Sequence, residues 1–188
     1  MKILQIHLLG RFRLIYDSQV LDCVNTPRMQ TLLAYLVLHA GVPVFRAQLA
    51  FAFWPDSSEA QALTNLRNLF HRLRKAIPDV DRFIKADTLS IQWIPGPAYR
   101  LDSQEFERLL SNNETFRAAI DMYTGDLMPD CYDDWIQPER ERLKRLFRDC
   151  CLALLDMLET ERDYSTALSY VNRLATSEPF DEEVCQRQ

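Results

Sequence analysis

The spacing of apolar residues changes along the chain, and these changes divide it into successive elements. Near the N-terminus apolar and polar residues partly alternate, which is typical of short antiparallel strands separated by turns. The strands are predicted over residues 2–8, 11–16 and 19–22. From about residue 26 apolar residues recur every three or four positions, which indicates amphipathic helices.

Three helices and a β-hairpin are predicted after these strands. The helices cover about 26–41, 46–53 and 57–76, and the hairpin strands cover 83–87 and 89–93. Pro27 is tolerated in a first helical turn, whereas Pro55 and Pro78 end the second and third helices. Asp56 or Ser57 is predicted to cap the third helix, because both can accept a hydrogen bond from its first turn.

The rest of the chain has a helical pattern throughout. Further helices are predicted over residues 102–111, 114–123, 139–161 and 164–178. We therefore predict an α+β fold, in which residues 1–97 form a winged helix-turn-helix and residues 98–188 form an all-helical domain resembling tetratricopeptide repeats. The last residues, EEVCQRQ, have the pattern of a helix that is starting, so we expect either a longer protein that continues past Gln188 or a terminal helix that is left short.

The third helix carries the candidate chemistry. Its apolar positions form one buried stripe, made of Leu63, Leu66, Phe70, Leu73 and Ile77. The remaining positions hold an unusual number of cations and amides: Thr64, Asn65, Arg67, Asn68, His71, Arg72, Arg74 and Lys75. A helix fits the major groove of duplex DNA, where such side chains contact phosphates and base edges. The alternative from the residues alone is an ordinary solvated helix face.

Charge supports the DNA interpretation. The whole chain has a formal net charge of −5, but residues 1–100 hold 12 Lys and Arg against 7 Asp and Glu. Residues 101–188 hold 10 against 20, so a basic half is followed by an acidic half. This asymmetry predicts two modules with different partners. Lys85 in the hairpin is a further candidate for DNA contact.

Several blocks resemble one bacterial family. LLGRFRL, LLAYLVLHAGVPVFRAQLAFAFWPD, NLRNLFHRLRKAI and FIKADTLSIQW are similar, in order, to the OmpR-like winged helix of the bacterial transcriptional activator domain family, which includes the Streptomyces antibiotic regulatory proteins. FERLL, YTGDLMPDCYDDWIQPERERLKRLF and DYSTALSYVNRLATSEPFDEEV resemble its helical second domain. The resemblance covers nearly the whole chain.

The resemblance implies a sequence-specific DNA-binding transcription regulator, an activator in the bacterial cytoplasm that associates with the nucleoid when bound. Double-stranded DNA would be its partner, with RNA polymerase and a second copy of the chain as further expected partners. Arg67, Asn68, His71 and Arg72 would face the groove. Arg74 and Lys75 would hold phosphates, unless one of them forms an internal salt bridge. The alternative function is a protein-interaction adaptor whose winged helix has lost DNA binding.

Arg28 and Arg46 are implied phosphate contacts because the family carries cations near these helix starts, and plain solvation is the alternative. Leu69 departs from the more cationic pattern of the family. If it is exposed, it can touch a thymine methyl group or a protein partner. Trp54 is expected to anchor the core.

Other classes of function receive little support from the sequence. His7, His39 and His71 are far apart, and motifs of hydrolases and metalloproteases are absent, so we predict no enzyme and no cofactor. The acidic loop with Asp126, Asp130, Asp133 and Asp134 does not have EF-hand spacing, so no metal is predicted and packing on the first domain is favoured.

Five cysteines without a C-x-x-C pair indicate reduced thiols, with Cys150 and Cys151 as apolar helix residues in preference to a redox sensor. No apolar run is long enough for a membrane helix.

Overall fold

The computed structural model describes residues 2–177, with side chains as far as Asn172. The predicted strands and helices are present in the predicted order, together with two strands that were not predicted, β4 and β7. The strands are β1 (Leu4–His7), β2 (Arg13–Tyr16), β3 (Gln19–Val20), β4 (Val44–Phe45), β5 (Ile84–Ala86), β6 (Ser90–Trp93) and β7 (Tyr99–Leu101). The helices are α1 (Pro27–Leu38), α2 (Arg46–Phe53), α3 (Glu59–Ala76), α4 (Asp102–Leu109), α5 (Phe116–Met122), α6 (Gln137–Glu161) and α7 (Tyr164–Ser177).

Three short 3-10 helices complete the described elements: η1 (Val80–Arg82), η2 (Asn113–Thr115) and η3 (Asp134–Ile136). The expected continuation of the chain lies outside the described residues, as does the fifth cysteine, Cys185.

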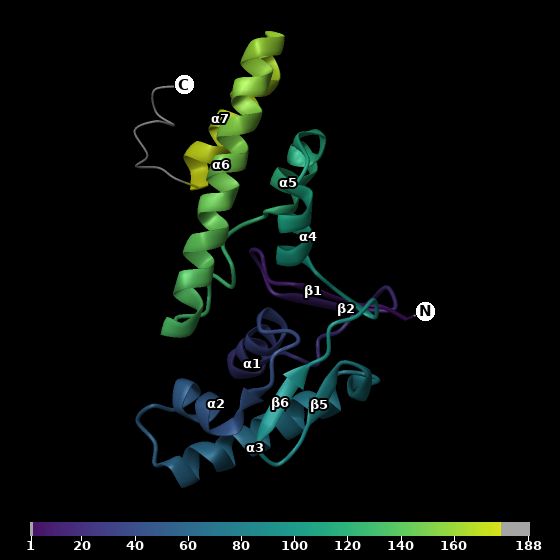
Figure 1. Cartoon of the computed structure of the whole chain (residues 1–188), viewed down its shortest axis with the longest axis vertical. Coiled ribbons are helices and arrows are strands. Elements are labelled where there is room, and N and C mark those ends of the chain that lie inside the picture. The colour runs from purple at the N-terminus through teal and green to yellow at the C-terminus, as the bar shows by residue number, and fades with distance from the viewer. Residues whose placement is uncertain (1, 178–188) are drawn as a thin grey trace.

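Two small sheets flank the first three helices. The four-stranded sheet has the order β3-β2-β1-β7, and the three-stranded sheet has the order β4-β6-β5. The predicted antiparallel β1-β2-β3 arrangement is confirmed, with Leu4 opposite Tyr16 and Ile15 opposite Val20. Together with α1, α2 and α3, the β5–β6 hairpin completes a winged helix, and we call this hairpin the wing (Figure 1).

Two strands were missed in the sequence. β7 runs parallel to β1, with Leu4 opposite Tyr99 and Ile6 opposite Leu101, although it immediately precedes α4 of the helical part. β4 is only two residues long and pairs with β6. Strands this short have too few residues for alternation to be recognised, and their pairing depends on partners far away in the chain.

The first three helices form around a continuous apolar core. α1 begins with Pro27 in its first turn, and most of its residues from Met29 to Val37 are buried. α3 is capped by Ser58, whose hydroxyl accepts a hydrogen bond from the Gln61 amide at 3.4 Å. The predicted caps Asp56 and Ser57 were therefore wrong by one or two residues, an error typical of helix ends.

The helical part extends away from the winged helix. α4 and α5 form a pair beside the β1–β2 ribbon, and the long α6 packs against α7 (Figure 1). α3 lies at one end of the molecule, and α7 with most of α6 lies towards the other end (Figure 1). The helix with the candidate chemistry is therefore remote from α7 and from most of α6.

Candidate nucleic-acid interface

α3 has one buried face and one exposed face, as the sequence predicted. Ala62, Leu66, Leu69, Phe70 and Leu73 are buried against α1 and α2. The opposite face exposes Thr64, Arg67, Asn68, His71, Arg72, Arg74 and Lys75, and Asn65 is half-buried beside them. Helical geometry places residues three and four apart on the same face, so these side chains form one polar surface. We call it the α3 face.

Most cations of the α3 face have no internal partner. The side chains of Arg67, Arg72 and Lys75 form no hydrogen bond or ion pair within residues 2–177. Arg74 differs, because it pairs with Asp81 of η1 at 2.5 Å. An internal salt bridge at Arg74 or Lys75 was one of the possibilities expected from the sequence. The unpaired side chains remain available to an external polyanion.

The polar residues at the start of the α3 face are partly engaged within the helix. Thr64 donates its hydroxyl hydrogen to the carbonyl of Ala60 at 2.9 Å. Asn65 accepts a hydrogen bond from the Gln61 side chain, also at 2.9 Å. Asn68 and His71 have no such bond among the described residues. These two side chains can therefore turn towards a ligand without breaking an internal contact.

Leu69 is buried, with 6% of its surface exposed, so a contact with a thymine methyl group or a partner is excluded. The adjacent Phe70 is buried as well, because the two residues lie on the two edges of the same apolar stripe. Trp54 is half-buried and packs against the core beside Phe53, with ring centroids 5.8 Å apart. This agrees with the expected anchoring role of Trp54.

Arg28 and Arg46 both have internal partners. Arg28 donates two hydrogen bonds to the carboxylate of Asp133, at 3.1 and 2.9 Å, and its guanidinium lies 5.8 Å from the centre of the Phe53 ring. Arg46 donates from Nε to the carbonyl of Asp87 at 3.0 Å. The side chains of Arg28 and Arg46 are therefore not simply solvated. Lys85 is exposed on β5 of the wing.

The acidic loop packs on the winged helix, as the sequence analysis favoured. The backbone amide of Gly10 donates to the carbonyl of Asp126 at 2.9 Å, and Asp133 holds Arg28. Gly10 has a φ of +76° and lies so close to Thr124 that a Cβ atom would be 2.8 Å from its hydroxyl oxygen. Within residues 2–177 no three His, Cys, Asp or Glu side chains are grouped as metal ligands.

Asp102 is a buried junction residue that the sequence did not reveal. Its carboxylate accepts hydrogen bonds from the amides of Leu8 and Leu9 at 2.9 to 3.0 Å, so the first turn of α4 caps the end of β1. Burial raises the pKa of Asp102, and the bonds from these amides oppose that rise. His7 lies 3.9 Å away, and burial lowers its pKa while Asp102 acts in the opposite direction.

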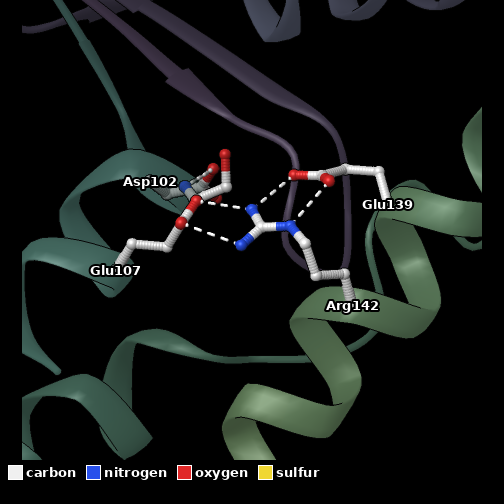
Figure 2. A network of polar contacts seen from close by, with 5 residues as sticks. Asp102, Glu107, Glu139 and Arg142 are labelled. Carbon is white, nitrogen blue, oxygen red and sulfur yellow. Dashed lines mark hydrogen bonds and ion pairs between the residues drawn. The ribbon is translucent and has the colours of Figure 1, made fainter.

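Arginine residues of α6 hold the helical part together. Arg142 donates to the carboxylates of Glu107 on α4 and Glu139 on α6 at 2.7 to 3.0 Å (Figure 2). Arg140 donates to the carbonyls of Leu127 and Cys131, both at 2.8 Å. Loop carbonyls and the α4 carboxylate Glu107 therefore hold these two arginines, although mixed charges such as those of residues 139–149 are typical of a solvated helix face.

The described cysteines are free thiols: Cys23, Cys131, Cys150 and Cys151. Burial raises the pKa of Cys150 to about 12, so its reactive thiolate is scarce at neutral pH. Cys151 is buried as well. These observations favour the apolar interpretation of the pair over a redox sensor.

Comparison with known proteins identifies the helical part. Residues 100–188 match the family model for the bacterial transcriptional activator domain. This part of the chain is a bacterial transcriptional activator domain. The matched residues begin within β7 and include helices α4 to α7. The resemblance found in the sequence is confirmed.

Two further comparisons extend over nearly the whole chain. The chain is 24% identical over 192 residues to the regulatory protein AfsR of Streptomyces coelicolor, a match that covers 95% of this chain and 19% of AfsR. It also matches the solved structure of Mycobacterium tuberculosis EmbR in complex with a low-affinity phosphopeptide, with a TM-score of 0.76 and 18% identity. That match covers 100% of this chain and 54% of EmbR and shows the shared fold.

The chain therefore spans about a fifth of one relative and about half of the other. Within the described residues, no helix has the length and apolar content that crossing a membrane requires.

Proposed function

We propose that this chain is a sequence-specific, DNA-binding transcription regulator, an activator, whose α3 enters the major groove. The observation that carries the proposal is the α3 face, on which Arg67 and Arg72 are exposed and unpaired within the described residues. An unpaired guanidinium can bind a phosphate oxygen or the edge of a guanine base. Each phosphate contact also releases a condensed counterion, which favours binding. The similarity to AfsR supports regulation of transcription as the context.

The position of α3 supports this proposal. Because α3 is at the end of the molecule opposite most of α6 and α7, duplex DNA can approach α3 without displacing these helices (Figure 1). Ser58 and Glu59 stabilise its start, and Arg74 and Lys75 lie in its last turn, where cations interact favourably with the helix dipole. The helix is therefore held rigidly while its polar face stays open.

The division of labour follows from the two parts. Residues 1–97 bind DNA, and residues 98–188 provide the surface for regulation, for self-association or for RNA polymerase. One recognition helix contacts only a short DNA half-site. The proposal therefore includes a homodimer that binds two repeated half-sites. The proposal requires no cofactor or catalysis, and it places the chain in the bacterial cytoplasm.

A salt titration tests this proposal. Binding of the full chain to a fluorescent random duplex is followed by anisotropy from low to high salt. A DNA-binding regulator loses affinity steeply, with a log–log slope of about −0.9 for each phosphate contacted. A protein-interaction adaptor shows no affinity even at low salt, which would contradict the proposal. Selection of bound sequences from a random duplex pool then tests sequence specificity, because enrichment of one motif is expected.

A further inference from the structure

The turn of the wing is fixed by one carboxylate. Oδ1 of Asp87 accepts hydrogen bonds from the amides of Leu89 and Ser90, at 2.8 and 2.6 Å, and another from the Ser90 hydroxyl at 3.2 Å. These bonds, particularly those from the two amides, lower the pKa of Asp87, which keeps it charged at neutral pH. The turn therefore has a defined shape, but its bonds do not determine where it lies relative to α3.

Arg46 connects this turn to the helices. Its backbone amide donates to the carbonyl of Leu89 at 2.8 Å, and its side-chain Nε donates to the carbonyl of Asp87 at 3.0 Å. The preceding residue, Phe45, pairs with Ser90 in the small sheet. A single residue at the start of α2 thus holds the turn through both its backbone and its side chain.

The same side chain also reaches α3. The guanidinium carbon of Arg46 lies 5.3 Å from the centre of the Phe70 ring, within the range of a cation–π contact. Phe70 is buried in the middle of α3, and Arg67 is one turn away on the same helix. Arg46 is half-buried between the wing and α3, so it links the two elements that the proposed function brings to DNA.

We propose that Arg46 is a positioning residue that sets the wing, and with it Lys85, relative to α3, and that it is not itself a phosphate contact. This inference rests on the proposed function. A planar guanidinium can lie over an aromatic ring while its Nε donates to a carbonyl, whereas a lysine ammonium cannot do both. β4 anchors β6 in the three-stranded sheet, and Arg46, the residue after β4, holds the turn at the end of this anchored hairpin.

A measurement without DNA tests the link. Amide hydrogen exchange of Asp87, Leu89 and Ser90 is followed by NMR in the full chain. Arg46→Ala is expected to speed exchange roughly tenfold, from the combined loss of one hydrogen bond and one cation–π contact. Arg46→Lys restores little of this protection. Arg82→Ala is the matched control, since Arg82 lies 5.7 Å from the Phe83 ring but has no bond to the turn. Unchanged exchange in Arg46→Ala, or full rescue by lysine, would overturn the inference.

A double-mutant cycle with DNA tests the consequence. Lys85→Ala and Arg46→Ala are each expected to reduce the steepness of the salt slope by about 0.9, the value of one phosphate contact. The double variant is expected to show the same reduction of about 0.9 in the salt slope, because both changes remove the phosphate contact of Lys85. A reduction of about 1.8 in the double variant would identify Arg46 as an independent phosphate contact and overturn the inference. No effect of Lys85→Ala would overturn it too.

Failure of the proposed function is distinguishable from failure of this inference. A wild-type chain without affinity for duplex DNA at low salt contradicts the proposed function. The exchange measurement does not involve DNA, so it still decides whether Arg46 holds the wing.

Discussion

Arg28 at the start of α1 and Asp133 in the loop before α6 form an ion pair with two hydrogen bonds, although 105 positions separate them in the sequence. The pair joins the winged helix to the bacterial transcriptional activator domain. Arg28 also contacts the Phe53 ring of α2, and the nearby rings of Tyr35 and Trp135 meet edge to face at 4.8 Å. Part of the junction is therefore aromatic, and the charged pair lies at its partly exposed margin.

We expect Asp133→Asn to lower the free energy of unfolding by less than about 1 kcal/mol, because partly exposed ion pairs are weak and screened by solvent. Denaturant unfolding followed by circular dichroism measures this value. Arg142→Ala is a useful comparison, since it removes contacts to two carboxylates and should cost more. A loss of several kcal/mol in Asp133→Asn would show that the pair is central to the junction.

Asp102→Ala is expected to be far more damaging. The change leaves the buried amides of Leu8 and Leu9 without an acceptor, and each orphaned group costs about 1–3 kcal/mol. Thermal unfolding should therefore occur at a clearly lower temperature. Glu105→Ala on the same helix is the control, because in the described part of the chain Glu105 pairs only with the exposed Arg108. Equal effects of the two changes would contradict the role assigned to Asp102.

Arg72→Ala is expected to weaken DNA binding by about 1–3 kcal/mol if the residue reads a base, with the fold unchanged because the side chain is exposed and unpaired within the described residues. Arg145→Ala is the matched control, since Arg145 is exposed on α6, outside the winged helix. Anisotropy with the selected duplex gives both affinities. Unchanged DNA affinity in Arg72→Ala would show that Arg72 does not face the groove.

His7 gives a prediction for pH. Burial lowers its pKa below the ordinary value of 6.5, and the charge of Arg13 lowers it further, while Asp102 raises it. Because the folded state disfavours protonation of His7, its contribution to stability is present above about pH 6.5 and is lost as the pH falls through the lowered pKa.

The test compares denaturant unfolding of the wild type and of His7→Gln between pH 7.5 and 5. The wild type should lose more stability than the variant over this range. The pKa of Asp102 is raised mainly by its burial, which the variant retains, and this shift acts in the opposite direction, favouring the fold at low pH. Parallel stability curves would show that His7 does not titrate in the way described.

The α3 face was predicted from the sequence because it depends on local periodicity. Leu66, Phe70 and Leu73 repeat at helical spacing, and a helix that buries them must expose Arg67, Asn68 and His71. Leu69 was the ambiguous position, since it lies at the edge of the apolar stripe. Its burial was decided by how α1 and α2 cover that edge, which depends on packing between distant segments.

The junction of the two parts could not be predicted in the same way. Asp102 looked like a helix-starting residue, and only the parallel pairing of β7 with β1 brings it under the amides of Leu8 and Leu9. Arg28 and Arg46 looked like free cations for the same reason. Their partners, Asp133 and Asp87, are 105 and 41 positions away in the sequence.

The sequence by itself determined the order of elements, the amphipathic α3 and the charge difference between the two halves, since each depends on residues that are close neighbours in the chain. The tertiary structure decided which arginines stay open to solvent and which are held by carboxylates, carbonyls and aromatic rings. A charged side chain is long and flexible, and it pairs with the groups that the fold brings beside it. Whether it is available to an external ligand therefore depends on packing and cannot be deduced from spacing in the sequence alone.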